Sequence, residues 1–129
     1  MIETDRVRKV PLFADLSDED LAWLAERFEE RSIREGGRAT EEGMPGYAFF
    51  AIEAGEAEVQ HGDSEVRKLV AGDTFGEAAI LGDGRRTADV VALTPLDVLV
   101  MHGTRFRELQ MHMPDLAASI EAAMREHRA

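Results

Sequence analysis

The sequence contains no cysteine among its 129 residues. This absence excludes disulfides, thiolate metal sites and cysteine nucleophiles. The sequence also lacks the run of roughly 20 apolar residues that a membrane-spanning helix needs, and its N-terminus lacks the apolar segment of a secretory signal. We therefore expect a cytoplasmic protein that does not contact a membrane.

Positive charge is scarce. The chain has 15 lysines and arginines against 26 acidic residues, which gives a net charge of −11 and a pI near 4.7. Proteins that bind DNA or RNA gain much of their affinity by neutralising phosphates, so an acidic domain without a basic stripe is a poor candidate for nucleic acid binding. An anionic ligand would need a local site that overrides this charge, and the adjacent Arg85 and Arg86 are the best local candidate.

Signatures of catalysis are missing as well. The four histidines are scattered and none has the spacing of a metal site. No serine lies in a G-x-S-x-G motif, and adjacent acids such as Glu41 and Glu42 are typical of a solvated face. We therefore expect neither a metal site nor catalytic residues, and we do not expect an enzyme.

The length and the 44% of hydrophobic residues fit one domain with a real core. We expect a single stand-alone domain over residues 1–129, without a DNA-reading element. Three parts are predicted: an N-terminal helical segment (1–31), a β-roll (32–102) and C-terminal helices (104–129).

A helix is predicted after Ser17, because an acid follows this serine at the third position, as in a capping box. Apolar residues then recur at helical spacing and indicate one buried face. This stripe consists of Leu21, Leu24, Ala25 and Phe28.

Two helices are predicted near the C-terminus. The first follows Thr104, and the second begins near Pro114, since proline suits the first helical position. The apolar stripe of the second helix fits two roles, packing on the sheet or pairing with a second copy; we favour pairing and so expect a homodimer. The stripe consists of Leu116, Ile120 and Met124.

Between these helices, short apolar runs alternate with turns about every 8–12 residues, a pattern typical of a β-sandwich, jelly roll or small barrel. We expect a mainly β fold of the jelly-roll type, a double-stranded β-helix with flanking helices. The predicted strands are 47–52, 56–60, 66–69, 89–93 and 97–102, with a hairpin turn at 61–64 and further turns at 36–37, 43–46, 54–55, 71–73 and 94–95.

The stretch that begins at Phe75 reads FGEAAILGDGRRTADV. Gly76 allows a positive φ or close backbone approach, and the first amides of a helical turn after it would form an anion seat. Ala78 and Ala79 are too small to obstruct this seat. A glycine-rich turn then brings Arg86 back, where its guanidinium can bind a phosphate bidentately.

Two further residues extend the site. Thr87 adds a hydroxyl and an amide. Glu77 would repel a phosphate, but it can accept hydrogen bonds from a sugar hydroxyl, as an acid does for ribose in dinucleotide folds. Phosphate donors beside a hydroxyl acceptor indicate a site for a small nucleotide.

The ordered set Phe75-Gly76-Glu77 and Arg86-Thr87-Ala88 resembles the phosphate-binding cassette of the cyclic nucleotide-binding domain family. This family includes catabolite activator proteins, protein kinase A regulatory subunits and cyclic-nucleotide-gated channels. The resemblance covers nearly the whole chain, including Glu42-Gly43, the stretch 51–55 and the stretch 71–77.

The resemblance implies a cassette over residues 75–88. In it, Arg86 would hold the exocyclic phosphate oxygens and Glu77 would accept from the ribose 2′-hydroxyl, while the neighbouring amides complete the contacts. The implied ligand-binding residues are Phe75, Gly76, Glu77, Ala78, Ala79, Arg86, Thr87 and Ala88.

The implied ligand is cAMP, with cGMP as close competitor because Thr87 is compatible with both; no other cofactor is expected. The implied role is a sensor that switches conformation on binding and acts on an effector that the sequence does not specify. A contact over the base would come from Met124, from His127, from a partner subunit, or not be made. The alternative is a β-roll that has lost its ligand and serves as a protein-interaction module.

Overall fold

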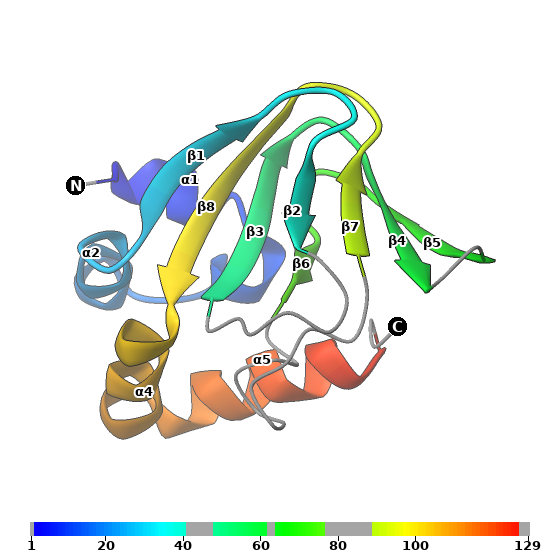
Figure 1. The fold of residues 1–129 in the computed structure, drawn as a ribbon. Helices are drawn as coiled ribbons and strands as arrows, with labels where there is room; N and C mark the ends of the chain where they lie inside the picture. Colours follow the sequence, from blue (N-terminus) through cyan, green and yellow to red (C-terminus); the bar gives the residue numbers. More distant parts are fainter. Residues whose placement is uncertain (1, 41–47, 62–63, 77–88, 127–129) are drawn as a thin grey trace.

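Two four-stranded antiparallel sheets and helices from both ends of the chain make up the structure, a computed structural model (Figure 1). It describes residues 2–40, 48–61, 64–76 and 89–126. The expected mainly β architecture with flanking helices is confirmed.

The N-terminal segment contains two helices and a single 3₁₀ turn between them. These elements are α1 (Thr4–Arg8), η1 (Pro11–Phe13) and α2 (Asp18–Ala25). Ser17 caps α2 as predicted, because its hydroxyl accepts a hydrogen bond from the Asp20 amide at 3.1 Å. The cap satisfies one of the amides that have no partner within the helix.

The predicted boundary of the β-roll at residue 32 is wrong by three residues. Helix α2 ends at Ala25, and strand β1 runs over Glu29–Ile33. Phe28 is buried, as predicted, but lies outside the helix. The first four residues of β1 are exposed, so the strand has no apolar alternation by which the sequence could reveal it.

The first sheet has the strand order β1-β8-β3-β6 and the second has the order β2-β7-β4-β5. The short strands β2 and β6 are absent from the prediction, since two or three residues carry no readable period. The two central residues of the predicted hairpin turn, 62 and 63, lie outside the described residues. The strands after β1 are β2 (Arg38–Thr40), β3 (Ala48–Ala54), β4 (Ala57–His61), β5 (Ser64–Leu69), β6 (Thr74–Phe75), β7 (Asp89–Ala92) and β8 (Leu96–His102).

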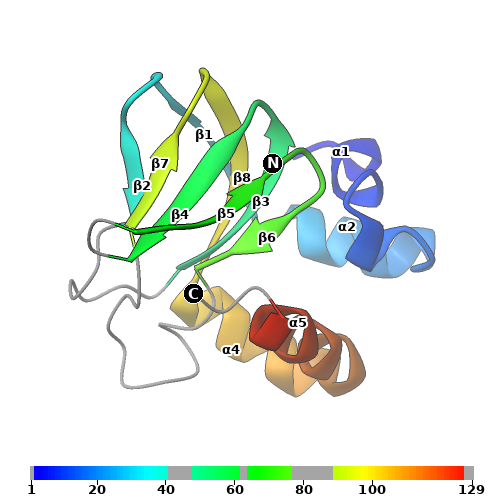
Figure 2. The ribbon, with the colours of Figure 1, turned by 90° about the vertical axis from the view of Figure 1, so that its right-hand side faces the viewer.

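Strand β3 contributes to two separate apolar clusters. Phe49 and Ala51 pack toward the helices in what we call the helix-side cluster. Phe50 and Ile52 pack between the two sheets in the inter-sheet cluster. Successive side chains of a strand point to opposite faces, so the first sheet separates the helices from the interior of the roll (Figure 2).

The C-terminal helices α4 (Gly103–His112) and α5 (Pro114–Glu126) are both confirmed. Leu116 and Ile120 of the predicted stripe are buried in the helix-side cluster, so they are not available to pair with a second copy. The Met124 side chain is outside the described part of the structure. Helix α5 contacts β6, which places it beside the end of the first sheet (Figure 2). No helix in the described ranges is long and apolar enough to span a membrane.

The turn between β3 and β4 depends on a glycine. Gly55 has a φ of +99°, and a Cβ placed there would lie 2.3 Å from the Pro95 carbonyl oxygen. The backbone therefore approaches closer than any side chain would allow. This contact joins the β3–β4 turn to the loop before β8 and confirms the predicted turn at 54–55.

Candidate functional site

The predicted cassette begins at the edge of the first sheet. Phe75 ends β6 and pairs with Phe50 of β3. Both side chains are buried, and their rings stack with centroids 4.7 Å apart and planes 4° apart. This stack fixes the start of the cassette in the inter-sheet cluster.

Gly76 follows this anchor with a φ of +87°. The prediction that this position uses the conformational freedom of glycine is therefore confirmed. Residues with a Cβ rarely adopt this backbone conformation, so the chain direction after Phe75 depends on glycine here.

The turn before β6 is bound tightly to β3. The Gly72 amide donates to the Ile52 carbonyl at 2.9 Å, and the Ile52 amide donates to the Asp73 carbonyl at 2.9 Å. Within the turn, the Asp73 carboxylate accepts from the Val70 amide at 2.8 Å. These bonds hold the approach to the cassette in register with the central strand.

The far end of the cassette lies on the other sheet. Asp89 begins β7, which pairs with β2 and β4. Its carboxylate lies 3.8 Å from the Arg38 guanidinium, and the next residue, Val90, is buried in the inter-sheet cluster. The two ends of the segment are thus fixed on opposite sheets of the roll (Figure 2).

Of the predicted ligand-binding residues, the structure describes two, Phe75 and Gly76. The proposed base contacts fall at His127 and at the Met124 side chain, which are also outside the described part. The roles of these residues stay predictions. The predicted site residues that lie outside the described ranges are Glu77, Ala78, Ala79, Arg86, Thr87 and Ala88.

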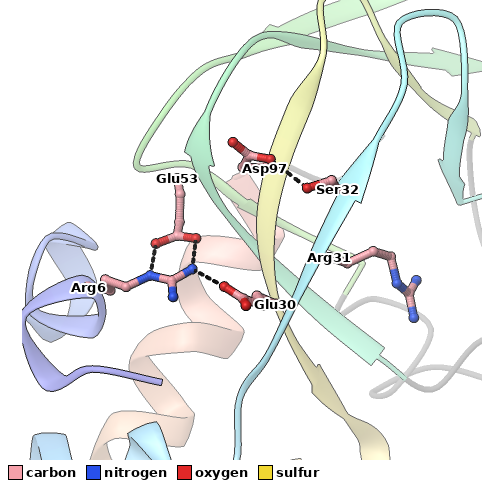
Figure 3. A pocket seen from close by; sticks show the side chains of 6 residues that line it. All are labelled: Arg6, Glu30, Arg31, Ser32, Glu53 and Asp97. Carbon is pink, nitrogen blue, oxygen red and sulfur yellow. Dashed lines mark hydrogen bonds and ion pairs between the residues drawn. The ribbon is translucent and has the colours of Figure 1, made fainter. Parts of the chain in front are cut away.

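A second cluster of functional groups, absent from the prediction, joins α1 to the first sheet (Figure 3). Arg6 donates to both carboxylate oxygens of Glu53, from Nε at 2.8 Å and from Nη2 at 2.7 Å. Its Nη2 also lies 2.8 Å from a carboxylate oxygen of Glu30. The hydrogen bonds with Glu53 and then Glu30 raise the pKa of Arg6, so this clasp of one arginine and two acids holds α1 to β3 and β1.

The clasp borders a cavity of about 440 Å³ that is also lined by Arg31, Ser32 and Asp97. Ser32 donates to Asp97 at 2.8 Å, while the Arg31 side chain points away from the other groups (Figure 3). Among the described residues, no group of three or more histidines or acids is arranged to hold a metal ion. The arrangement is that of a structural ion pair.

A third cluster joins α2 to α4. Glu108 accepts from Arg27 at 2.7 Å and from Arg105 at 3.1 Å, and these contacts, that with Arg27 foremost, lower the pKa of Glu108. The Arg27 guanidinium also lies 3.7 Å from the centre of the Trp23 ring, a cation–π geometry. One carboxylate therefore organises both arginines.

The Glu108 cluster predicts a pH effect on stability. A carboxylate with a lowered pKa in the folded state stabilises the fold above its unfolded pKa of about 4.5, and this contribution is lost as the pH falls through the folded value. Between pH 6 and pH 3, the Tm of wild type should fall further than that of Glu108→Gln. Thermal unfolding followed by circular dichroism measures this, with the exposed acid Glu35→Gln as the matched control. Equal losses in wild type and Glu108→Gln would contradict the assignment.

A roll of two four-stranded antiparallel sheets belongs to the jelly-roll class of folds. A comparison with known protein families identifies one family within this fold class. Residues 30–112 match the family model of the cyclic nucleotide-binding domain, and the chain belongs to this family.

Relatives in sequence include a kinase regulatory subunit and a kinase. Over 107 residues the chain is 35% identical to a cAMP-dependent protein kinase regulatory subunit from Colletotrichum orbiculare, which covers 81% of this chain and 27% of that protein. It is 33% identical over 111 residues to cGMP-dependent protein kinase, isozyme 1, from Drosophila melanogaster, covering 80% of this chain and 14% of the kinase. The chain thus spans less than a third of the length of these relatives.

Similarity in structure extends over nearly all of the chain. The crystal structure of a protein from Geobacter metallireducens GS-15, named as a cyclic nucleotide-binding protein, superposes on this chain with a TM-score of 0.82 at 27% identity. The alignment covers 95% of this chain and 92% of that one. The predicted jelly-roll fold and the predicted family are both confirmed.

Proposed function

We propose that this chain binds cAMP and acts as the sensing module of a regulatory protein. The observation that carries the proposal is the family match over residues 30–112, which spans the cassette sequence. The conformation of Gly76, directly after a buried and stacked Phe75, supports it. The kinase regulatory subunits among the relatives favour cAMP over cGMP as the first ligand to test.

In the proposed complex, Arg86 binds the cyclic phosphate and Glu77 accepts the ribose 2′-hydroxyl. The amides of Ala78 and Ala79 complete the anion seat. The proposed site needs both the cation Arg86 and the anion Glu77, because a cyclic nucleotide presents a charged phosphate and a free hydroxyl on the same ring system.

The proposed output is a shift between two arrangements of the cassette and the flanking helices. Helix α5 contacts β6, the strand that leads into the cassette. A ligand that binds one arrangement more tightly raises its population by that difference in affinity. The position of α5 is therefore the proposed signal to the rest of the protein.

The proposed role is regulatory rather than catalytic, in the cytoplasm, with an effector protein as partner. A homodimer through α5 stays a prediction, and the burial of Leu116 and Ile120 removes two of the residues on which it rested. Sedimentation equilibrium with and without cAMP measures the oligomeric state directly.

Calorimetric titration with cAMP, cGMP and AMP tests the proposed ligand. We expect both cyclic nucleotides to bind, cAMP more tightly, and AMP to bind much more weakly because its phosphate is not closed onto the ribose. Absence of binding by either cyclic nucleotide would overturn the proposal and favour the ligand-free interaction module.

A substitution of Glu77 tests the proposed contact with the ribose hydroxyl. Glu77→Ala should weaken cAMP binding by about tenfold or more, the scale of a hydrogen bond to a charged group. Asp83→Asn, which removes an acid from the same segment, is the matched control and should leave the affinity within about twofold. Equal affinities for Glu77→Ala and wild type would contradict the ribose role.

A further inference from the structure

Thr74 is the one buried polar residue in the part of the chain that the structure describes, with 2% of its surface exposed. It forms the two-residue strand β6 together with Phe75, and Gly76 follows directly. A hydroxyl that is taken out of water costs free energy unless a hydrogen bond replaces its water contacts. Buried hydroxyls in folded proteins are therefore hydrogen-bonded, and such a bond depends on direction as well as distance.

The pairing of β6 places Thr74 on the helix side of the first sheet. Thr74 lies opposite Ala51 of β3, and Phe75 lies opposite Phe50. Residues that face each other across two strands point to the same face, and Ala51 belongs to the helix-side cluster. The stacked rings of Phe50 and Phe75 occupy the opposite face. Consecutive residues of β6 thus belong to different sides of the sheet.

Helix α5 contacts β6 and lies on the helix side of the sheet (Figure 2). Its buried residues in the helix-side cluster are Leu116, Ala117 and Ile120. Apolar contacts of this kind are not directional, so they hold α5 against the sheet without selecting one register sharply. A hydrogen bond from a single hydroxyl is satisfied at one register and lost at the others.

We propose that Thr74 is a positioning residue that fixes the register of α5 on the first sheet. In coiled coils, one buried polar residue in an apolar seam specifies the register at a cost in stability. Thr74 has the corresponding place here, as one hydroxyl in an apolar layer. Because Thr74 also precedes the cassette by one residue, a displacement of β6 and a displacement of α5 act on the same hydrogen bond.

This inference deepens the proposed function and rests on it for the output alone. In that function, cAMP shifts the population between two arrangements of the cassette and the flanking helices. Coupling of this kind needs an element with two discrete positions. The register of α5 provides them: one position in which the Thr74 hydroxyl is bonded, and one in which α5 is displaced. The register itself can be measured without a nucleotide.

Two variants of Thr74 test the proposal. Thr74→Val removes the hydroxyl and keeps the shape of the side chain, whereas Thr74→Ser keeps the hydroxyl. Amide spectra and relaxation dispersion of the ¹⁵N-labelled protein detect exchange between registers on the μs–ms timescale. In Thr74→Val we expect a second set of α5 signals or exchange broadening, with the minor register about 2- to 10-fold more populated, the factor for one lost hydrogen bond. Wild type and Thr74→Ser should both give one sharp set.

Thr104→Val is the matched control, because it makes the same change at an exposed residue of α4. Its α5 signals should be those of wild type. A hydroxyl that contributes stability alone would give another result: the Tm of Thr74→Val would fall, and α5 would keep one sharp set of signals. Thr74→Ala removes the same hydroxyl and replaces Thr74→Val in the test if that variant does not fold.

One sharp set of α5 signals in Thr74→Val, or equal exchange in Thr74→Val and Thr74→Ser, would overturn the proposal. Saturating cAMP is then added to Thr74→Val, and we expect the two registers to collapse to one, because cAMP binds one arrangement more tightly. A protein that does not bind cAMP contradicts the proposed function but still gives the complete register result. Bound cAMP that leaves both registers populated as before would contradict the role of Thr74 in the output.

Discussion

Arg86→Ala is expected to weaken cAMP binding by at least about 1.5–3 kcal/mol, the contribution of a hydrogen bond to a charged group, or about 10- to 150-fold in Kd. The overall charge makes this arginine decisive. With a net charge of −11, the protein repels an anionic ligand at long range, and the local guanidinium must compensate. Calorimetric titration at physiological ionic strength measures the effect, because surface charges are then screened beyond about 8 Å.

Two variants determine whether the effect comes from contact or from net charge. Arg85→Ala removes the same charge from the neighbouring position and should cost much less than Arg86→Ala. Arg86→Lys retains the charge but loses the planar fork, so its affinity should fall between those of wild type and Arg86→Ala. Similar losses for Arg85→Ala and Arg86→Ala would show a general field effect and refute the assigned contact.

Phe49→Ala is expected to lower the free energy of unfolding by about 3–5 kcal/mol, the usual cost of truncating a buried phenylalanine. Phe49 is fully buried at the centre of the helix-side cluster. Its ring lies 5.8 Å from Phe28 and 5.9 Å from Phe106, both edge-on. One side chain thus joins the N-terminal segment, the first sheet and α4, and the loss is a large share of a typical stability of about 5–15 kcal/mol.

Urea unfolding, followed by circular dichroism and by the fluorescence of the single tryptophan Trp23, measures this cost. Leu93→Ala is the matched control, because Leu93 is 39% exposed and outside both clusters. Its loss should stay below about 1 kcal/mol. A cost for Phe49→Ala no greater than that of Leu93→Ala would contradict the central position of Phe49.

Much of the fold could be predicted from local patterns. Ser17 marked the start of α2, and an apolar stripe marked α5, because a cap and a 3.6-residue period are local signals. Strand β1 could not be predicted, since its register with β8 is a long-range property and its exposed, polar residues show no period.

The candidate site, too, has features that could be predicted from the sequence and features that could not. At Gly76 the sequence predicted a positive φ or a close backbone approach, because glycine has no Cβ, and the structure has the positive φ. The Arg6–Glu53 pair could not be predicted, because 47 residues separate its partners and only the packing of α1 on β3 brings them together. A half-buried charged pair of this kind has no sequence spacing that identifies it.

The alternation of β3 has a mechanical consequence. Phe49 and Phe50 are consecutive, yet one packs with the helices and the other stacks on Phe75 at the cassette entry. Strand β3 is closely packed on both faces. It cannot shift on one face alone, since closely packed interiors transmit displacement. We therefore expect a displacement of the inner side of β3, such as nucleotide binding would impose, to reach the helices through the strand itself.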